Sequence, residues 1–450
     1  MIAPSHSVGI RSTLAVLLVI SFAAPPALPR APASREYLDA ALAAERWIRA
    51  SAQRAGNSTL WPAQPSDPKS VSYNLYTGMP GIVLFYLEAW HATGDKAFLD
   101  FARSGATALV ARMENEADPG LYTGLAGIGF AVTETYKATN DPAFRQGVLR
   151  CLELFRQRAH KVGAGIAWSD YNDVIFGSAG VGLFLLYAAH ALNDKSAKEL
   201  AVQAGLRLIE LGQSENGGLK WPQDPKFPRL MPNFSHGTAG VAYFLATLYQ
   251  ETHQKTFLDA ALAGARYLLS IANTDDGVCL IFFNEPWAKD IYYLGWCHGP
   301  AGTARLFYRL FQVTGDRKWM EWVKKGARGI LASGIPKKLT PGYWNNVGQC
   351  CGSAGVVEFF LALHRITRDP EYLAFARRVA ADLVARATRD VHGGESTLRW
   401  LQAEHRLAPK LLIAQTGYMQ GASGIAMSLL HLDEFDRALR PAITLPDSPF

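Results

Sequence analysis

The sequence is poor in cysteine and in charged residues, and it has no apolar stretch of membrane-spanning length. Five cysteines in 450 residues are too few, and odd in number, for a disulfide-stapled scaffold. Charged residues make up 19% of the chain, and its 45 basic and 39 acidic residues are dispersed, so nucleic-acid binding is not expected. P-loop, dinucleotide-binding and serine-nucleophile motifs are absent. Apolar residues make up 49%, which excludes a mainly disordered chain.

The N-terminal region contains a short apolar run, residues 14–24 (LAVLLVISFAA), which follows Arg11 and ends at Pro25. A membrane-spanning helix needs about 20 apolar residues, so a secretory leader fits this run better. We expect residues 1–33 to be a signal peptide or an uncleaved membrane anchor, the only part of the chain that would contact a membrane. Cleavage is expected within residues 31–33 or 21–23. The mature chain is expected to be exported to the periplasm or beyond.

Seven Gly-x-x-Gly motifs recur along the rest of the chain, each followed by an apolar segment. Their first glycines are 46, 53, 60, 62, 53 and 69 residues apart. The segments that follow, such as VGLFLLYAA and VAYFLATLY, are apolar nearly all round, which is typical of buried helices. The motifs begin at Gly78, Gly124, Gly177, Gly237, Gly299, Gly352 and Gly421.

Amphipathic segments alternate with the apolar ones. Several open with Asp or Asn, as at Asp95 and Asp369, where a helix N-cap is expected. Seven amphipathic and seven buried helices predict an all-α fold over residues 34–440, an (α/α)7 toroid with the Gly-x-x-Gly motifs at the inner-helix N-termini. The glycines would allow tight turns there. The ring closes if the helix after Gly421 contacts the one that begins near Ser34; an open solenoid is the alternative. Residues 441–450 are a C-terminal tail.

Three cysteines occupy equivalent positions in consecutive repeats. Cys297 and Cys350 lie two residues before a first glycine, and Cys351 lies one residue before. His236 and His298 also directly precede first glycines. If all seven motifs gather at one end of the ring, these side chains share one cavity, and helix N-termini pointing into it favour thiolates. Three thiolates, or two thiolates and an imidazole, are typical zinc ligands, so we predict that this cavity holds a zinc site.

At these residues the sequence resembles the lanthionine synthetase C-like family, the cyclases of lanthipeptide biosynthesis. The motifs are Trp296-Cys-His-Gly-Pro-Ala-Gly302, then Cys350-Cys-Gly352, with His236-Gly237 upstream, and the resemblance covers about residues 35–435. It implies a barrel of seven inner and seven outer helices around one zinc ion. The implied ligands are Cys297, Cys350 and, where the family usually has His, Cys351.

The resemblance also implies an active-site role for His236 and for the acidic Asp173. Tyr293 stands where the family commonly has Arg, and His298 where it commonly has Tyr. The implied activity is addition of a cysteine thiol to dehydroalanine or dehydrobutyrine. His236 is the candidate general acid, and His298 a proton donor or further metal ligand. Asp173 orients a histidine or accepts a proton, or it caps the third buried helix.

The substrate would be a peptide, or a small thiol and its electrophile. A true cyclase would also need a separate dehydratase, because no part of the sequence supplies one. Two other functions remain open. A carbohydrate-active toroid would need two carboxylates in the cavity, from Asp173, Asp275, Asp276 or Glu285. A non-catalytic, zinc-stabilised binding protein would place His236 or His298 on the metal as a fourth ligand.

Overall fold

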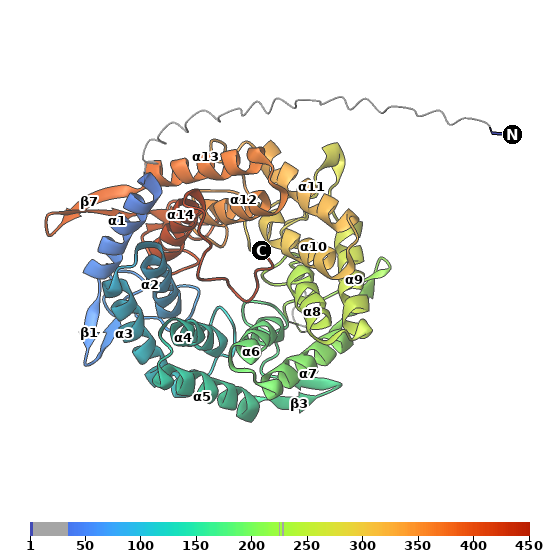
Figure 1. Ribbon diagram of the computed structural model, residues 1–450, viewed down its shortest axis with the longest axis horizontal. Coiled ribbons are helices and arrows are strands. Elements are labelled where there is room, and N and C mark those ends of the chain that lie inside the picture. Colours follow the sequence, from blue (N-terminus) through green and yellow to red (C-terminus); the bar gives the residue numbers. More distant parts are fainter. Residues whose placement is uncertain (3–34, 225, 227–228) are drawn as a thin grey trace. The chain divides into compact units, whose positions relative to one another are not determined.

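The computed structural model describes residues 1–2, 35–224, 226 and 229–450, and within them fourteen α-helices alternate between an outer and an inner ring (Figure 1). Residues 35–450 form one compact unit. The predicted leader lies outside the described residues except for Met1 and Ile2. In the part that is described, no helix combines the length and apolar character needed to cross a bilayer.

The inner helices are the predicted apolar segments, and each begins directly after the first glycine of a motif. Most of their residues are buried, because neighbours contact them on every side. The inner helices are α2 (Met79–Thr93), α4 (Leu125–Thr139), α6 (Ser178–Leu192), α8 (Thr238–Thr252), α10 (Pro300–Thr314), α12 (Ser353–Thr367) and α14 (Ala422–Asp436).

The outer helices are the predicted amphipathic segments. Aspartates cap several of them: Asp95 accepts a hydrogen bond from the Ala97 amide at 2.9 Å, which satisfies a donor at the helix start. The outer helices are α1 (Glu36–Ala50), α3 (Lys96–Arg112), α5 (Pro142–Arg158), α7 (Lys195–Leu211), α9 (Lys255–Ser270), α11 (Lys318–Ala332) and α13 (Pro370–Arg386).

The ring is closed, as predicted. Helix α14 packs against α1 and also against α2 and α12, so the last inner helix joins the first repeat to the sixth. Each of the other inner helices is paired with the outer helix that follows it. Six inner helices end at a residue in the left-handed conformation, and the outer partner begins within a few residues, which keeps the pair antiparallel.

The motif glycines serve close packing, which differs from the expected tight turn. Gly299, the N-cap of α10, has an extended φ of −126°, which other residues also adopt. The second glycine of that motif is needed for space, since a Cβ on Gly302 would lie 1.8 Å from the carbonyl oxygen of Trp296. A Cβ on Gly240 would lie 2.1 Å from the carbonyl oxygen of Phe234. The glycines thus let the loop backbone lie directly on the inner helix.

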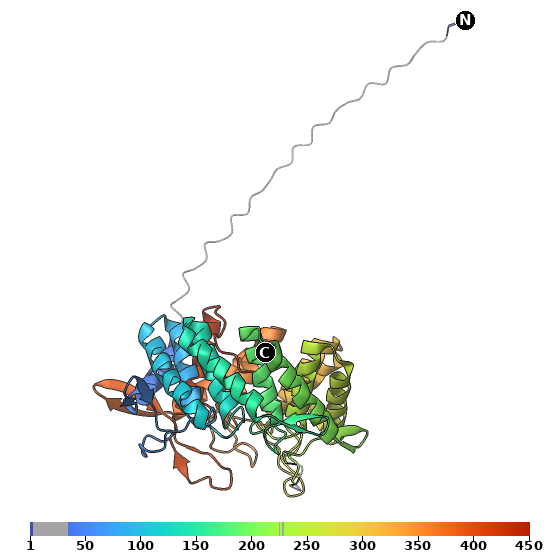
Figure 2. The ribbon, with the colours of Figure 1, turned by 90° about the horizontal axis from the view of Figure 1, so that it is seen from below.

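Five two-stranded antiparallel sheets, not predicted from the sequence, lie in connections from outer to inner helices, at one face of the toroid (Figure 2). They are hairpins too short to show strand periodicity. The strands are β1 (Gln53–Ala55), β2 (Ser58–Leu60), β3 (His160–Val162), β4 (Gly165–Ala167), β5 (Gln213–Glu215), β6 (Gly218–Lys220), β7 (Thr388–His392), β8 (Glu395–Arg399), β9 (Gln402–Ala403) and β10 (Leu412–Ile413). Two 3-10 turns, η1 (Met113–Asn115) and η2 (Asp275–Gly277), complete the elements.

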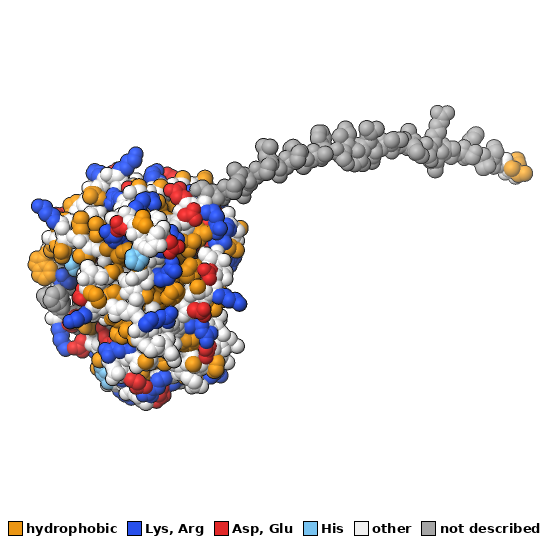
Figure 3. Space-filling view, turned by 90° about the vertical axis from the view of Figure 1, so that its left-hand side faces the viewer, with side chains coloured by type: hydrophobic (Ala, Val, Ile, Leu, Met, Phe, Trp, Pro, Cys, Tyr) orange, Lys and Arg blue, Asp and Glu red, His pale blue; other side chains and the backbone are white. Residues whose placement is uncertain are grey.

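The C-terminal segment 441–450 runs to the centre of the ring (Figure 1). The buried carboxylate of Asp447 accepts a hydrogen bond from the indole of Trp296 at 3.1 Å and pairs with Arg305 at 3.4 Å. Phe450 stacks on Tyr308. The tail therefore fills the ring beneath the loop that carries Cys297. On the face drawn in Figure 3, basic and acidic side chains are interspersed.

Candidate metal centre

A ring of backbone hydrogen bonds joins the loops that precede the inner helices. The residue two positions before each first glycine donates to its counterpart in a neighbouring repeat, at 2.9 to 3.2 Å, and Val174 replaces Ile175 in one link. The ring brings equivalent positions of all seven repeats around one centre. Its links, from amide to carbonyl, are Tyr76 to Tyr122, Tyr122 to Ile175, Val174 to Ser235, Ser235 to Cys297, Cys297 to Cys350, Cys350 to Met419, and Met419 to Tyr76.

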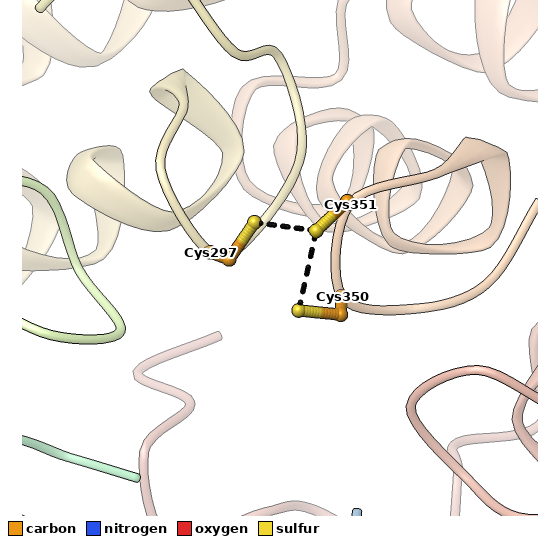
Figure 4. A group of neighbouring side chains, drawn as sticks. All are labelled: Cys297, Cys350 and Cys351. Carbon is orange, nitrogen blue, oxygen red and sulfur yellow. Dashed lines mark hydrogen bonds between the residues drawn. The ribbon is translucent and has the colours of Figure 1, made fainter. Parts of the chain in front are cut away.

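The three predicted cysteines meet at this centre (Figure 4). Cys297 comes from the loop before α10, and Cys350 and Cys351 come from the loop before α12. The Sγ atoms of Cys297 and Cys351 are 2.8 Å apart, and those of Cys351 and Cys350 are 3.5 Å apart. Their sulfur atoms all lie within 4.8 Å of one another, a spacing at which one metal ion can contact all three.

The electrostatics of the group favour a cation. Burial and the neighbouring thiols raise the pKa of Cys297 well above its usual value. Burial acts in the same direction on Cys350, but hydrogen bonds from Cys297, Cys351 and the Tyr76 hydroxyl lower its pKa. One sulfur therefore carries negative charge most readily while its neighbours donate to it. All three can ionise together only if a positive ion compensates their charge, and soft thiolates select Zn²⁺ among common cations.

A cavity of about 590 Å³ opens above the cysteines. Aromatic side chains form much of its wall, including Phe283, Tyr293 and Trp344, and 64%-exposed Trp287 stands at its rim. Two guanidinium groups, of Arg229 and Arg406, also line it. The cavity thus joins an apolar wall, positive charge and the thiol group in one space, as a binding site for an organic substrate requires.

His236 lies in the same cavity and is held from behind by Asp173. Its Nδ1 is 2.6 Å from Oδ2 of Asp173, a carboxylate with no solvent exposure. This contact places the proton of the ring on Nδ1 and leaves Nε2 available. The other oxygen, Oδ1, accepts hydrogen bonds from the amides of Phe176 and Gly177 at 2.7 and 2.9 Å. Asp173 therefore orients the histidine and also fixes the turn before α6, whose N-cap is Gly177.

His298 lies beside His236, with ring centroids 5.5 Å apart, and packs against Phe283 and Tyr293. Burial lowers the pKa of His298 well below its usual value, so the ring is neutral. Its buried Nδ1 has no hydrogen-bond partner among the described residues. At this centre, the group of mutually close ligand atoms in the described chain consists of the three cysteine sulfurs, and neither histidine belongs to it. The cysteine group thus leaves room for a further ligand.

Tyr293, which stands where the resemblance implies an arginine, stacks on Phe283 with ring centroids 4.3 Å apart. The guanidinium of Arg406, from the connection between β9 and β10, lies over the ring of Phe283, 5.6 Å from its centroid. This guanidinium also interacts with Tyr293. A cation is thus present beside Tyr293, although it comes from a segment more than a hundred residues further along the chain.

Two residues at the site had no predicted role. Tyr76 occupies the position in the first repeat that is equivalent to Cys297. This equivalence was the available signal, because equivalent positions of all seven repeats surround one centre. Arg406 lies outside every motif, so the sequence offered no signal for it. The carboxylates proposed for a carbohydrate-active site are not assembled. Asp275, Asp276 and Glu285 are not among the residues lining the cavity, and Asp173 is buried behind His236.

Comparisons with known proteins agree with this architecture. A family model described as lanthionine synthetase C-like protein matches residues 69–445. The chain is 28% identical over 139 residues to glutathione S-transferase LANCL1 of Danio rerio, a match that covers 31% of this chain and 32% of that protein. The chain thus spans about a third of that relative's length.

Among solved structures, nisin cyclase aligns with a TM-score of 0.59 and 17% identity, covering 82% of this chain and 90% of that one. The Lin0763 protein from Listeria innocua aligns with a TM-score of 0.51 and 14% identity, covering 90% and 99%. At these identities the likeness shows the fold alone.

Proposed function

This chain belongs to the lanthionine synthetase C-like family, and from that membership and the site geometry we propose that it is a zinc-dependent enzyme that adds a cysteine thiol to an unsaturated residue. The acceptor would be dehydroalanine or dehydrobutyrine in a peptide, and the product a thioether. The single observation that carries the proposal is the group of three sulfurs at the floor of a cavity that also contains His236.

Cys297, Cys350 and Cys351 would hold the zinc ion. When bound, zinc supplies Lewis acidity that favours the thiolate form of a substrate thiol. The residues fit the ion because they provide soft donors in a buried group whose joint ionisation requires a cation. The backbone ring fixes two of the three ligands, since Cys297 donates its amide to Cys350, and Cys350 donates to Met419.

The proposed reaction is a redox-neutral addition. The substrate sulfur passes its proton to Nε2 of His236 and forms a bond to the β-carbon of the acceptor while the carbon–carbon π bond breaks. Its electron pair moves to the α-carbon and the adjoining carbonyl as an enolate, and the α-carbon then takes a proton. His236 is positioned to deliver that proton, since the contact with Asp173 holds its orientation. His298, which is neutral and buried, forms part of the cavity wall and places a second imidazole beside His236.

The negative charge of the enolate needs compensation. Arg406 supplies a guanidinium in the cavity beside Tyr293, the position at which the family resemblance implies an arginine. Electrostatic stabilisation of a developing oxyanion is a large term in such reactions, so we assign this role to Arg406. A separate dehydratase would supply the acceptor. Action outside the cytoplasm, with residues 1–33 as an export signal or membrane anchor, stays part of the proposal.

The test is an addition assay with zinc-loaded, full-length protein and a peptide that contains one dehydroalanine and one cysteine. Thioether formation removes the free thiol, so alkylation followed by mass spectrometry measures the rate. We expect the wild type to exceed the uncatalysed rate and Cys350→Ser to lose the excess. Cys279→Ser is the matched control, because Cys279 is equally buried but lies outside the group and is expected to keep full activity. A zinc-containing wild type no faster than buffer would reject the proposal.

A further inference from the structure

A second cluster of ligating side chains lies at the opposite ends of the inner helices. Helix α2 carries Glu88 and His91 three residues apart near its C-terminus, and α14 carries His431 and Glu434 with the same spacing. Residues three apart lie on the same face of a helix. Because α2 and α14 are neighbours in the ring, the two pairs face one another.

The carboxylates of this cluster are deeply buried. Glu88 and Glu434 have no solvent exposure. Glu88 accepts hydrogen bonds from the amides of Ala442 and Ile443 in the tail, at 2.9 and 2.7 Å. Neither oxygen of Glu434 has a hydrogen-bond partner in the described chain. A buried carboxylate without partners is costly unless a proton or a cation neutralises it.

The neighbouring groups leave Glu434 as the carboxylate that is least compensated. The imidazole of His431 lies between two other acids, 2.8 Å from Glu358 and 3.6 Å from Glu88. The ion-pair contact of Glu434 among the described residues is with Nε2 of His91, at 3.8 Å. Charges on Arg365 and Arg437 also act on Glu434 but do not form an ion pair with it within the described residues.

We propose that Glu88, His91 and Glu434 bind a second divalent transition-metal ion, distinct from the ion held by the cysteines. One ligand atom from each residue lies within 4.8 Å of the others. Two carboxylates and one imidazole suit Zn²⁺ or Mn²⁺ more than a soft ion such as Cu⁺. Nε2 of His91 lies 3.0 Å from the carbonyl oxygen of Arg440, and metal binding through this nitrogen replaces that contact.

The position of the site gives it a structural consequence. Glu88 accepts hydrogen bonds from the amides of Ala442 and Ile443 in the C-terminal tail. The same tail carries Asp447, which accepts a hydrogen bond from the indole of Trp296. The C-terminal ends of helices carry partial negative charge, so acidic residues there need a cation more than those at other helix positions. A metal ion between α2 and α14 would therefore link the last repeat to the first and stabilise the position of the tail.

Metal stoichiometry tests the proposal independently of any activity. The full-length protein is stripped with a chelator, reloaded with Zn²⁺, dialysed, and measured by elemental mass spectrometry. We expect about two zinc ions per wild-type chain and about one in the double variant Cys350→Ser, Cys351→Ser, because each cluster forms its own site. Glu434→Gln, with its cysteines intact, is expected to lose about one ion. A wild type that holds one ion, lost with the cysteines, overturns the proposal.

Two further variants guard against a folding artefact. His91→Ala changes a side chain that is 39% exposed and is expected to lose the same ion as Glu434→Gln without disturbing the core. Glu134→Gln is the matched control, because Glu134 is a buried acid on α4 that is already paired with Lys137 at 2.9 Å. It is expected to keep both ions. If His91→Ala and Glu434→Gln both keep both ions, the second site is elsewhere and the assignment is wrong.

Discussion

The two carboxylate oxygens of Asp173 have different roles: one fixes the turn before α6 and the other orients His236. Two substitutions at this residue separate these roles. Oδ1 accepts the amides of Phe176 and Gly177, and Oδ2 pairs with His236. Asp173→Asn keeps an acceptor for the two amides but places an NH₂ group against the histidine. Asp173→Ala removes both functions. We therefore expect the two variants to differ in stability but to share a loss of activity.

The magnitudes follow from the contacts. Hydrogen bonds to a charged group contribute about 1.5–3 kcal/mol each, and buried donors left unsatisfied cost about 1–3 kcal/mol. Asp173→Ala leaves the Gly177 amide buried without its partner and is expected to lower the free energy of unfolding by about 3 kcal/mol. Asp173→Asn keeps that partner at lower charge and is expected to cost about 1 kcal/mol. In the thiol-addition assay both are expected to lose about 10²- to 10⁴-fold, the usual contribution of a general acid.

Urea unfolding of the full-length protein, followed by far-ultraviolet circular dichroism, measures the stability difference, and the alkylation assay measures the rate. Equal destabilisation by the two substitutions would refute the assignment of Oδ1 to the turn before α6. An unchanged rate for Asp173→Asn would refute the orienting role of Oδ2. The stability measurement stands whether or not the proposed substrate is the natural one.

Three other predictions test separate parts of the molecule. Arg368→Gly is expected to raise the free energy of unfolding by about 1 kcal/mol in urea, because exposed Arg368 has a φ of 62°, which glycine adopts without strain; a lower midpoint contradicts this. Asp447→Ala is expected to cost about 3–5 kcal/mol in the same assay, since it leaves Arg305 without its buried partner, and a loss under 1 kcal/mol excludes a structural role for the tail. Cys351→His, which restores the family's usual ligand, is expected to slow thiol addition, because three thiolates make a bound sulfur more electron-rich than two; an unchanged rate in the alkylation assay rejects that reasoning.

The fold was largely predictable because the pattern of apolar and polar residues within each repeat indicates its two helices. An apolar segment after a glycine pair can be stable only as a buried helix, and an Asp-capped amphipathic segment can cover it from one side. What the repeat could not reveal is the use of the glycines. Gly302 is required because the carbonyl oxygen of Trp296 would lie 1.8 Å from a Cβ there, a contact between residues that only the folded loop brings together.

The site was predictable where it follows the repeat and not where it departs from it. Cys297 and Cys350 share a repeat position, so their proximity followed once the ring was assumed to close. Tyr76 shares that position too. Tyrosines are common in aromatic cores, so the sequence alone did not predict that its hydroxyl donates a hydrogen bond to Cys350. Arg406 comes from the connection between β9 and β10, which contains none of the repeated motifs. No spacing rule connects it to Tyr293.

The two faces of the ring differ in a way that the polarity of the inner helices explains. All seven helix N-termini point to one face, where partial positive charge favours anions, and there the three thiols and the buried carboxylate of Asp173 lie. The C-termini point to the other face, where the same dipoles oppose negative charge. Glu88 and Glu434 are nevertheless buried there, so their placement requires positive charge from another source. Nearby His431 supplies part of it to Glu88, whereas neither oxygen of Glu434 has a hydrogen-bond partner in the described chain.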